Sequence, residues 1–212
     1  MARGGRPRSG ERREQILDVA LRLFAEHGIQ QVSTRRIAQA VGISQPSLYA
    51  HFRTSDEIAV ELCCRGFTRL HDQLTGASAK AGTPEERLRR LGEEYVRFGL
   101  EHPAVYRVAF MLDQPTGHGD EPSPVLAAGL RAFGVLLALF QEVRDAHDDK
   151  TTALAQSTWA SMHGLVALFL VRHEFPWVRR ETLIALHLDR ICTHAFEDAR
   201  STTNVRQNGY LS

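Results

Sequence analysis

Residues 33–57 read STRRIAQAVGISQPSLYAHFRTSDE, and this stretch predicts two short helices joined by a tight turn. Apolar side chains at helical spacing indicate a first helix over 33–41. Ser33 or Thr34 is placed to cap its free N-terminal amides. Gly42 follows the apolar run directly and is a typical helix stop.

A second helix is predicted over 45–52. Ser44 is a suitable N-terminal cap, and Pro46 falls in the first turn, where a missing amide hydrogen costs nothing. Leu48 and Phe52 are four residues apart, so both are expected to point into a core. Two short helices joined by a turn of about four residues form the helix-turn-helix motif.

The start of this second helix suits a DNA groove. Gln45, Pro46 and Ser47 are short or amide-bearing, and side chains of this kind can enter a major groove and meet base edges. Tyr49 and His51 are expected at the rim, where a phenol and an imidazole can hydrogen-bond phosphate oxygens. Such contacts fix the register of the protein on DNA without reading sequence.

The run IAQAVGISQPSLYAHF (37–52) resembles the signature of the TetR family of bacterial transcriptional regulators. The glycine, the serine cap, the Leu-Tyr pair and the His-Phe pair all fall at the spacing of that family. The resemblance implies a three-helix DNA-binding head and a role in regulating transcription. It also implies that the residues facing the operator are Ser33, Arg35, Arg36, Ser44, Gln45, Pro46, Ser47, Tyr49 and His51.

Two positions depart from the family pattern. The family usually has an acidic residue where this chain has Arg36, and a lysine where this chain has Ser55. One expected phosphate contact is therefore absent, and another is gained.

Charge is distributed unevenly along the 212 residues, although the formal net charge is only +1. Residues 1–53 contain nine arginines against four acidic residues, a net of +5, which leaves −4 for the remainder. A basic N-terminal quarter is the electrostatic footprint of nucleic-acid binding. Within it, residues 1–10 are glycine-rich and basic, so they are predicted to be a disordered arm that either reaches a flanking minor groove or only aids solubility.

Composition places the chain among soluble globular proteins, with 43% hydrophobic and 24% charged residues. Its three cysteines, two of them adjacent as Cys63 and Cys64, do not make a disulfide framework and fit a reduced cytoplasm. Neither a signal peptide nor an uncharged apolar run of about 18 residues is expected. We therefore expect a cytoplasmic, nucleoid-associated protein without membrane contact.

Helical periodicity continues to the C-terminus, which predicts an all-α fold of about nine helices without strands. The expected organisation is a helix-turn-helix domain over 11–54, a ligand-binding and dimerisation domain over 55–200 and a flexible tail over 201–212. Capping boxes at Thr54 and Thr83 are expected to begin two of the helices. Besides the two short helices of the helix-turn-helix, helices are expected at 11–27, 55–75, 84–100, 103–112, 124–145, 151–172 and 179–200.

The second half resembles the TetR subfamily whose ligand domain is named for a Trp-His-Gly motif, through HPAVYRVAF (102–110) and through Trp159, His163 and Gly164. Trp159 and His163 are four residues apart and share a helix face. They are either the wall of a ligand pocket or ordinary core residues, with Gly164 admitting a close helix crossing.

Aromatic residues on the central helices are candidates to surround an effector, although such residues also build plain cores. Few charges are expected near them, so the effector is expected to be a small apolar or aromatic molecule. The candidate ligand-binding residues are Phe67, Tyr95, Phe98, Tyr106, Phe110, Met111, Trp159 and His163.

The last two predicted helices carry apolar residues on more than one face. One face can serve the core and the other a twofold partner, so we expect a homodimer through these helices, as in the TetR family. A dimer with two heads is expected to bind a palindromic DNA operator.

Neither a metal site nor a cofactor site is indicated, and no catalytic residues are nominated. His187 and His194 can share a helix face, but no further ligand completes a set at familiar spacing. Motifs for nucleotide binding or nucleophilic catalysis are absent from the sequence.

The expected function is a transcriptional repressor that an effector releases from DNA. Two alternatives stay open at this stage. The chain can be an architectural DNA-binding protein with a sealed C-terminal core, or an enzyme that uses the C-terminal cavity.

Overall fold

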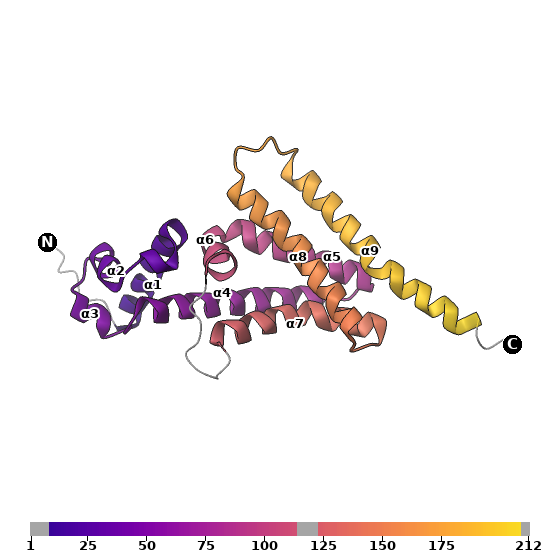
Figure 1. Ribbon diagram of the computed structural model, residues 1–212, viewed down its shortest axis with the longest axis horizontal. Helices are drawn as coiled ribbons and strands as arrows, with labels where there is room; N and C mark the ends of the chain where they lie inside the picture. The colour runs from indigo at the N-terminus through magenta and orange to yellow at the C-terminus, as the bar shows by residue number, and fades with distance from the viewer. Residues whose placement is uncertain (1–8, 114–122, 209–212) are drawn as a thin grey trace. The chain divides into compact units, whose positions relative to one another are not determined.

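The computed structural model describes residues 9–113 and 123–208, and all regular structure in these ranges is helical. The all-α prediction is thus confirmed, and Figure 1 shows the order of the elements. The α-helices of this described part are α1 (Ser9–His27), α2 (Thr34–Val41), α3 (Gln45–Tyr49), α4 (Ser55–Ser78), α5 (Pro84–Glu101), α6 (Pro103–Tyr106), α7 (Pro124–Arg144), α8 (Asp149–Val171) and α9 (Arg180–Asn208).

Local side-chain chemistry sets several of these helix boundaries. The Thr83 hydroxyl accepts a hydrogen bond from the Glu86 amide, and the Glu86 carboxylate accepts one from the Thr83 amide, which is a complete capping box at the start of α5. At the start of α4 the Thr54 hydroxyl caps the Glu57 amide. The Glu57 carboxylate, however, reaches back to the amide of Arg53. Both starts lie where the sequence predicts them.

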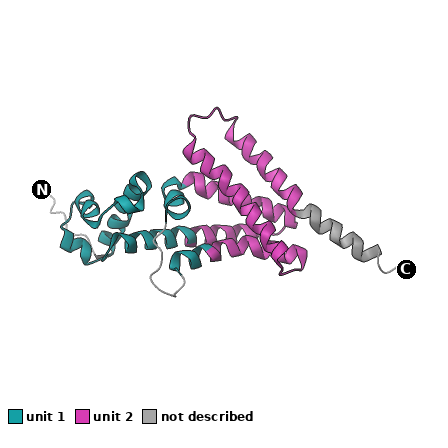
Figure 2. Cartoon of the chain, in the orientation of Figure 1, with its two compact units in different colours: residues 1–67, 102–129 teal, residues 68–101, 130–212 magenta. Residues whose placement is uncertain are grey.

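The described chain forms two compact units, each built from two separate stretches (Figure 2). Unit 1 comprises residues 1–67 and 102–129, and unit 2 comprises 68–101 and 130–212. The unit that holds the helix-turn-helix is therefore larger than the predicted 11–54 domain. It includes the first half of α4, the residues of α6 and the start of α7.

The core of unit 1 gathers apolar side chains from α1 to α4. Phe24 of α1, Ile37 of α2 and Leu48 of α3 are fully buried together with Phe52 and Ile58. Short helices such as α2 and α3 are not stable alone in water, so this shared core holds them in place.

Unit 2 is a helical bundle in which α5 packs against both α8 and α9. Gly92 of α5 lies at a close crossing, because a Cβ atom added there would come within 2.5 Å of the Leu188 side chain of α9. Leu91 of α5 and Val166 and Phe169 of α8 are buried in this unit.

Some boundaries differ from the predicted ones. The α3 helix ends at Tyr49 and not at Phe52, and Phe52 enters the core from the following turn. The sixth helix begins as α-helix but continues as a π-helix over Arg107–Met111. The α9 helix extends to Asn208, so the predicted tail is helical over residues 201–208.

Parts of two other predicted segments lie outside the described residues. They are residues 1–8 of the predicted basic arm and residues 114–122 of the predicted loop between the sixth and seventh helices.

Among the described helices, α7 and α8 are long and apolar enough to cross a membrane by length and composition, with mean hydropathies of 1.7 and 1.3. Residues 151–171 contain no Asp, Glu, Lys or Arg, so the expectation of no long uncharged run was wrong for α8. Core helices of globular proteins pass the same test, and α8 contributes Ala155, Val166 and Phe169 to the core of unit 2.

Candidate nucleic-acid interface

The turn between α2 and α3 is built by two serine caps and one glycine. The Ser33 hydroxyl accepts a hydrogen bond from the Arg36 amide at the start of α2, and the Ser44 hydroxyl accepts one from the Ser47 amide at the start of α3. Gly42 ends α2 with a φ of 77°, a left-handed conformation that favours glycine. These three residues fix the direction in which α3 leaves the turn.

The predicted DNA-facing residues occupy the solvent side of this motif. Arg35, Arg36, Pro46, Ser47 and Tyr49 are exposed. In contrast, Leu48 is fully buried and anchors the opposite side of α3. Of the remaining predicted residues, Gln45 and His51 are partly exposed, while the hydroxyls of Ser33 and Ser44 serve as caps.

Tyr49 connects the start of α2 to the start of α3. Its hydroxyl accepts a hydrogen bond from the Gln45 amide nitrogen Nε2 at 3.0 Å. The same hydroxyl lies 3.4 Å from the Thr34 hydroxyl of α2. These hydrogen bonds, from Thr34 first and Gln45 second, lower the pKa of the Tyr49 phenol. Sequence reasoning had not linked Thr34 to α3.

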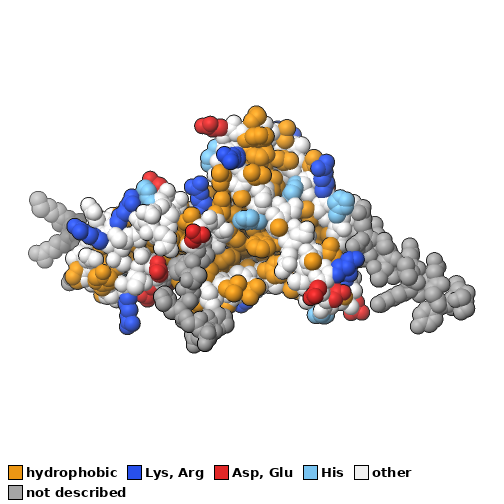
Figure 3. Space-filling model, viewed as in Figure 1, with side chains coloured by type: hydrophobic (Ala, Val, Ile, Leu, Met, Phe, Trp, Pro, Cys, Tyr) orange, Lys and Arg blue, Asp and Glu red, His pale blue; other side chains and the backbone are white. Residues whose placement is uncertain are grey.

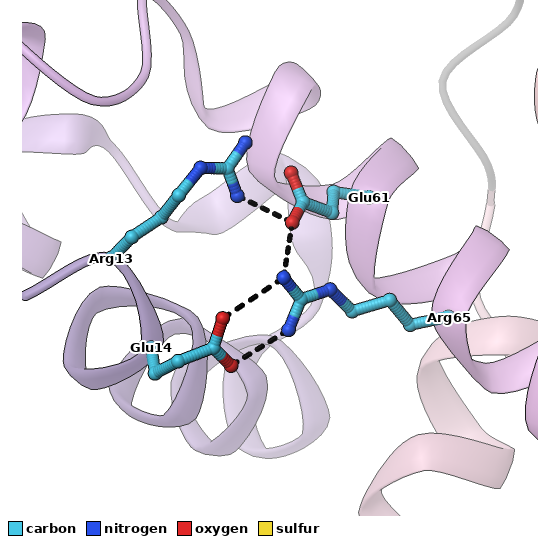
Figure 4. A network of polar contacts seen from close by, with 4 residues as sticks. All are labelled: Arg13, Glu14, Glu61 and Arg65. Atoms are coloured by element: carbon cyan, nitrogen blue, oxygen red, sulfur yellow. Dashed lines mark hydrogen bonds and ion pairs between the residues drawn. The ribbon is translucent and has the colours of Figure 1, made fainter. Parts of the chain in front are cut away.

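A network of ion pairs joins α1 to α4 within unit 1 (Figure 4). Arg65 of α4 donates to both carboxylate oxygens of Glu14 of α1, at 2.7 and 3.0 Å. The Glu61 carboxylate lies between Arg65, at 2.7 Å, and Arg13 of α1. The hydrogen bond from Arg65 lowers the pKa of Glu14. Sequence reasoning missed the ion pairs between α1 and α4 because these partners lie about fifty residues apart.

Arg13 also has an aromatic partner. Its guanidinium carbon lies 4.2 Å from the centre of the Phe52 ring, a cation–π geometry. Phe52 is the last residue of the family-like signature and is buried. Arg13 of α1 thus contacts both the Glu61 carboxylate of α4 and Phe52, which follows α3.

The candidate ligand-binding residues fall into the two units. In unit 1 the Phe110 ring makes an edge contact with Phe67 and stacks on Tyr106, with both centroid distances at 4.7 Å. Tyr106 is fully buried, and Met111 of the π-helix is partly exposed. These aromatic side chains pack on one another as a core cluster.

In unit 2 the Trp159 indole nitrogen donates to the Tyr95 hydroxyl at 3.1 Å. The Trp159 ring lies 6.1 Å from His163, and the indole side chain is 38% exposed. Burial lowers the pKa of His163, which favours the neutral imidazole. Phe98 is almost fully buried. Trp159 and His163 therefore share a helix face, as predicted, and this face is partly open.

Histidine and acidic side chains do not assemble a metal site in the part of the chain that the structure describes. His187 Nε2 lies 3.2 Å from both the hydroxyl and the carbonyl oxygen of Ser161. His187 of α9 is thus within hydrogen-bonding distance of Ser161 of α8.

Comparison with known protein families gives two matches. Residues 16–62 match the model described as "Bacterial regulatory proteins, tetR family". Residues 88–191 match the model described as "Tetracyclin repressor-like, C-terminal domain". Together the two matches cover more than half of the chain. Neither description names the Trp-His-Gly subfamily, which stays a prediction.

Individual relatives agree with these matches. The chain is 30% identical over 105 residues to the uncharacterized HTH-type transcriptional regulator YobS of Bacillus subtilis (strain 168), covering 50% of this chain and 54% of that protein. It is 44% identical over 57 residues to the tetracycline repressor protein class D of Escherichia coli, covering 25% and 26%. The matched segments span about half or less of the length of these curated relatives.

Solved structures extend the likeness to nearly the whole fold. The TetR family transcriptional regulator PfmR from Thermus thermophilus superposes with a TM-score of 0.67 at 23% identity, covering 84% of this chain and 97% of that one. At this identity the likeness concerns the fold alone. The proteins named in these comparisons are regulators of transcription and not enzymes.

Proposed function

Because the chain belongs to the TetR family of DNA-binding transcriptional regulators, we propose that it is a repressor that binds a palindromic operator as a homodimer. A small apolar or aromatic effector releases it. The observation that carries this proposal is the solvent-exposed α2–α3 face inside the segment that matches the family.

DNA contact is assigned to the exposed face of α2 and α3. Arg35 and Arg36 at the start of α2 supply positive charge for phosphate oxygens. Gln45, Pro46 and Ser47 begin α3 and are assigned to base edges in the major groove. The family-typical lysine near the start of α4 is replaced by Ser55, so Arg36 is assigned the compensating phosphate contact.

The outer face of α8 supports the dimer. Small residues recur there at the alternating spacing of four and three residues that one helix face requires. They are Ala153, Ser157, Ala160, Gly164 and Ala167, all at least partly exposed. A Cβ atom added at Gly164 would meet nothing within 4 Å. A second helix can therefore approach this face closely.

Large exposed apolar residues continue beside that stripe. Leu168 of α8 is 48% exposed and Leu186 of α9 is 47% exposed. Figure 3 shows hydrophobic side chains gathered at the end of α8 and the connection to α9, where Val171, Phe175 and Val178 are also exposed. Such a patch favours burial against another copy of the chain.

The effector is assigned to the aromatic side chains of the C-terminal region. Trp159 offers a partly exposed ring, and Tyr95 and His163 offer a phenol and a neutral imidazole beside it. A neutral imidazole gives a polar contact without attracting anions. This combination suits a ligand that is mostly apolar with one polar group.

Release is proposed to follow a two-state equilibrium. The α4 helix is continuous from unit 1 into unit 2, so it is one of the covalent connections between the effector region and the DNA-binding head. An effector that prefers the state unable to bind DNA shifts the population toward it. A coupling of roughly 1–3 kcal/mol would weaken operator binding about 5- to 150-fold. The proposed place of action is the bacterial cytoplasm, at the nucleoid.

A library of small apolar and aromatic compounds tests this assignment. Compounds that raise the melting temperature of the protein are added to the protein–operator complex, and the fraction of bound DNA is measured by fluorescence anisotropy. The proposal expects at least one compound to release DNA and to be recovered chemically unchanged. If every stabilising compound leaves DNA binding intact, the protein is an architectural DNA-binding protein without effector control.

A further inference from the structure

The Tyr49 hydroxyl occupies a position that a simple phosphate contact does not require. It receives the Gln45 Nε2 hydrogen bond at 3.0 Å and lies 3.4 Å from the Thr34 hydroxyl. Gln45 is the first residue of α3 and Tyr49 the last, so the bond spans one helical turn on the exposed side. Thr34 belongs to the first turn of α2. The Tyr49 phenol thus links the first turn of α2 to the first residue of α3 on the solvent-exposed side of the motif.

The bond to Tyr49 occupies only part of the hydrogen-bonding capacity of the Gln45 side chain. A glutamine amide has two N–H hydrogens and one carbonyl oxygen. The bond to Tyr49 uses one hydrogen and leaves the second hydrogen and the Oε1 acceptor for a base. A paired donor and acceptor on one edge is the pattern that binds N7 and the N6 amino group of adenine in the major groove.

We propose that Tyr49 is a positioning residue that holds the Gln45 amide in one orientation and thereby makes Gln45 selective for adenine in the operator. The inference rests on the proposed operator binding of α3. A free glutamine side chain has several rotatable bonds, and fixing it before DNA arrives removes part of the entropy cost of binding. Tyr49 then acts on sequence selectivity and not only on affinity.

Thr34 completes this arrangement. A hydrogen bond between the Tyr49 and Thr34 hydroxyls, in which either oxygen can donate, keeps the phenol from rotating away. The Tyr49 ring is 48% exposed, so burial alone does not fix it. Removing either hydroxyl is therefore expected to loosen Gln45.

The first experiment follows the Gln45 side-chain amide by NMR in the free protein. We compare the wild type with Tyr49→Phe, which keeps the ring and removes the hydroxyl. Relaxation of the Gln45 side-chain nitrogen is expected to show restricted motion of the amide in the wild type and faster, larger motion in Tyr49→Phe. Equal mobility of the amide in both proteins would overturn the proposed positioning role, whatever the protein binds.

The second experiment measures base preference. Operator sequences are selected from random DNA, and binding is measured on the selected operator and on its single-base variants. Tyr49→Phe is expected to lower discrimination by about 5- to 10-fold at the base pair where Gln45→Ala also lowers it. In the Gln45→Ala background, Tyr49→Phe should change that preference no further. Thr34→Val should reproduce part of the loss.

His51→Ala serves as the control, because His51 is assigned to the phosphate backbone and its loss should lower affinity for all sequences alike. If Tyr49→Phe behaves like His51→Ala, with uniform weakening and unchanged base preference, Tyr49 is only a backbone contact and the inference fails. If the wild type selects no sequence at all, the proposed operator binding fails as well. The NMR result distinguishes these two failures, because it does not depend on DNA.

Discussion

At the scale of single residues, the direction of α3 depends on Gly42. Its φ of 77° lies in the left-handed region, and its amide ends α2 by hydrogen bonding to the carbonyl of Gln39. A side chain at this position strains the backbone by about 1–2 kcal/mol because Cβ approaches the following carbonyl oxygen. The space around Gly42 is open, so this strain is a property of the backbone and not of a clash.

We predict that Gly42→Ala lowers the free energy of unfolding by about 1–2 kcal/mol, measured by urea denaturation. The matched control is Gly76→Ala. Gly76 lies inside α4 with nothing within 4 Å of an added Cβ, so alanine there should be neutral or stabilise by up to about 1 kcal/mol. Equal effects of the two substitutions would contradict the assigned role of Gly42.

His163 gives a second prediction at this scale. Burial lowers its pKa in the folded protein, so the unfolded chain binds the proton more tightly. The free energy of unfolding should therefore fall as pH drops below the ordinary histidine pKa of about 6.5. It should fall less in His163→Gln. The measurement is urea denaturation of both proteins between pH 8 and pH 5, and parallel pH curves would show that His163 does not contribute.

At the scale of elements, α1 is held to α4 by the network of Arg13, Glu14, Glu61 and Arg65 (Figure 4). Glu61 is the shared partner, and its side chain is 22% exposed. Partly exposed ion pairs contribute little singly, but a carboxylate that serves two arginines contributes more than an isolated pair. The network therefore matters most at low ionic strength.

We predict that Glu61→Gln lowers the free energy of unfolding by about 0.5–1 kcal/mol at low salt and by less in 1 M NaCl, where charges are screened. Glu57→Gln is a suitable control on the same helix, since Glu57 caps the Arg53 amide and lies outside the network. A loss that is independent of salt would show that Glu61 acts through packing.

The proposed dimer interface on the outer face of α8 can be tested by introducing a charge there. Ala160→Glu should place a charge in the centre of the proposed dimer interface, at a cost of at least about 3 kcal/mol. The dimer dissociation constant should then rise by about 100-fold or more, as measured by sedimentation equilibrium. Ala138→Glu, on the exposed side of α7, should leave the dimer unchanged. A monomeric wild type, or equal behaviour of both variants, would contradict dimerisation through α8.

At the scale of the whole molecule, local signals account for what the sequence could predict. Serine and threonine caps, glycine stops and the apolar spacing act within one helical turn, so the helix order and the α2–α3 turn follow from them. The contact of Tyr49 with Thr34 and the ion pairs of α1 with Glu61 and Arg65 join residues that are not neighbours on one helix. No local pattern marks such pairs. The π-helical Arg107–Met111 was missed for a related reason, since its apolar residues fit an ordinary helix equally well.

The two candidate sites also differ in how far local sequence patterns could predict them. The predicted DNA-facing residues share one short motif, so their common exposure follows from helix geometry. The predicted ligand-binding residues come from several helices, and the structure distributes them between an aromatic cluster around Phe110 and another around Trp159. Spacing along the sequence cannot assign them to one of these clusters.

The central claim is that this chain recognises a specific palindromic DNA sequence through α3. Selection of bound sequences from random DNA by the purified protein, at a stated salt concentration, tests it most directly. The account predicts enrichment of a palindrome, with a base preference that changes in Gln45→Ala. Salt-sensitive binding without any enriched sequence would contradict it and would leave a DNA-binding protein that reads only the phosphate backbone.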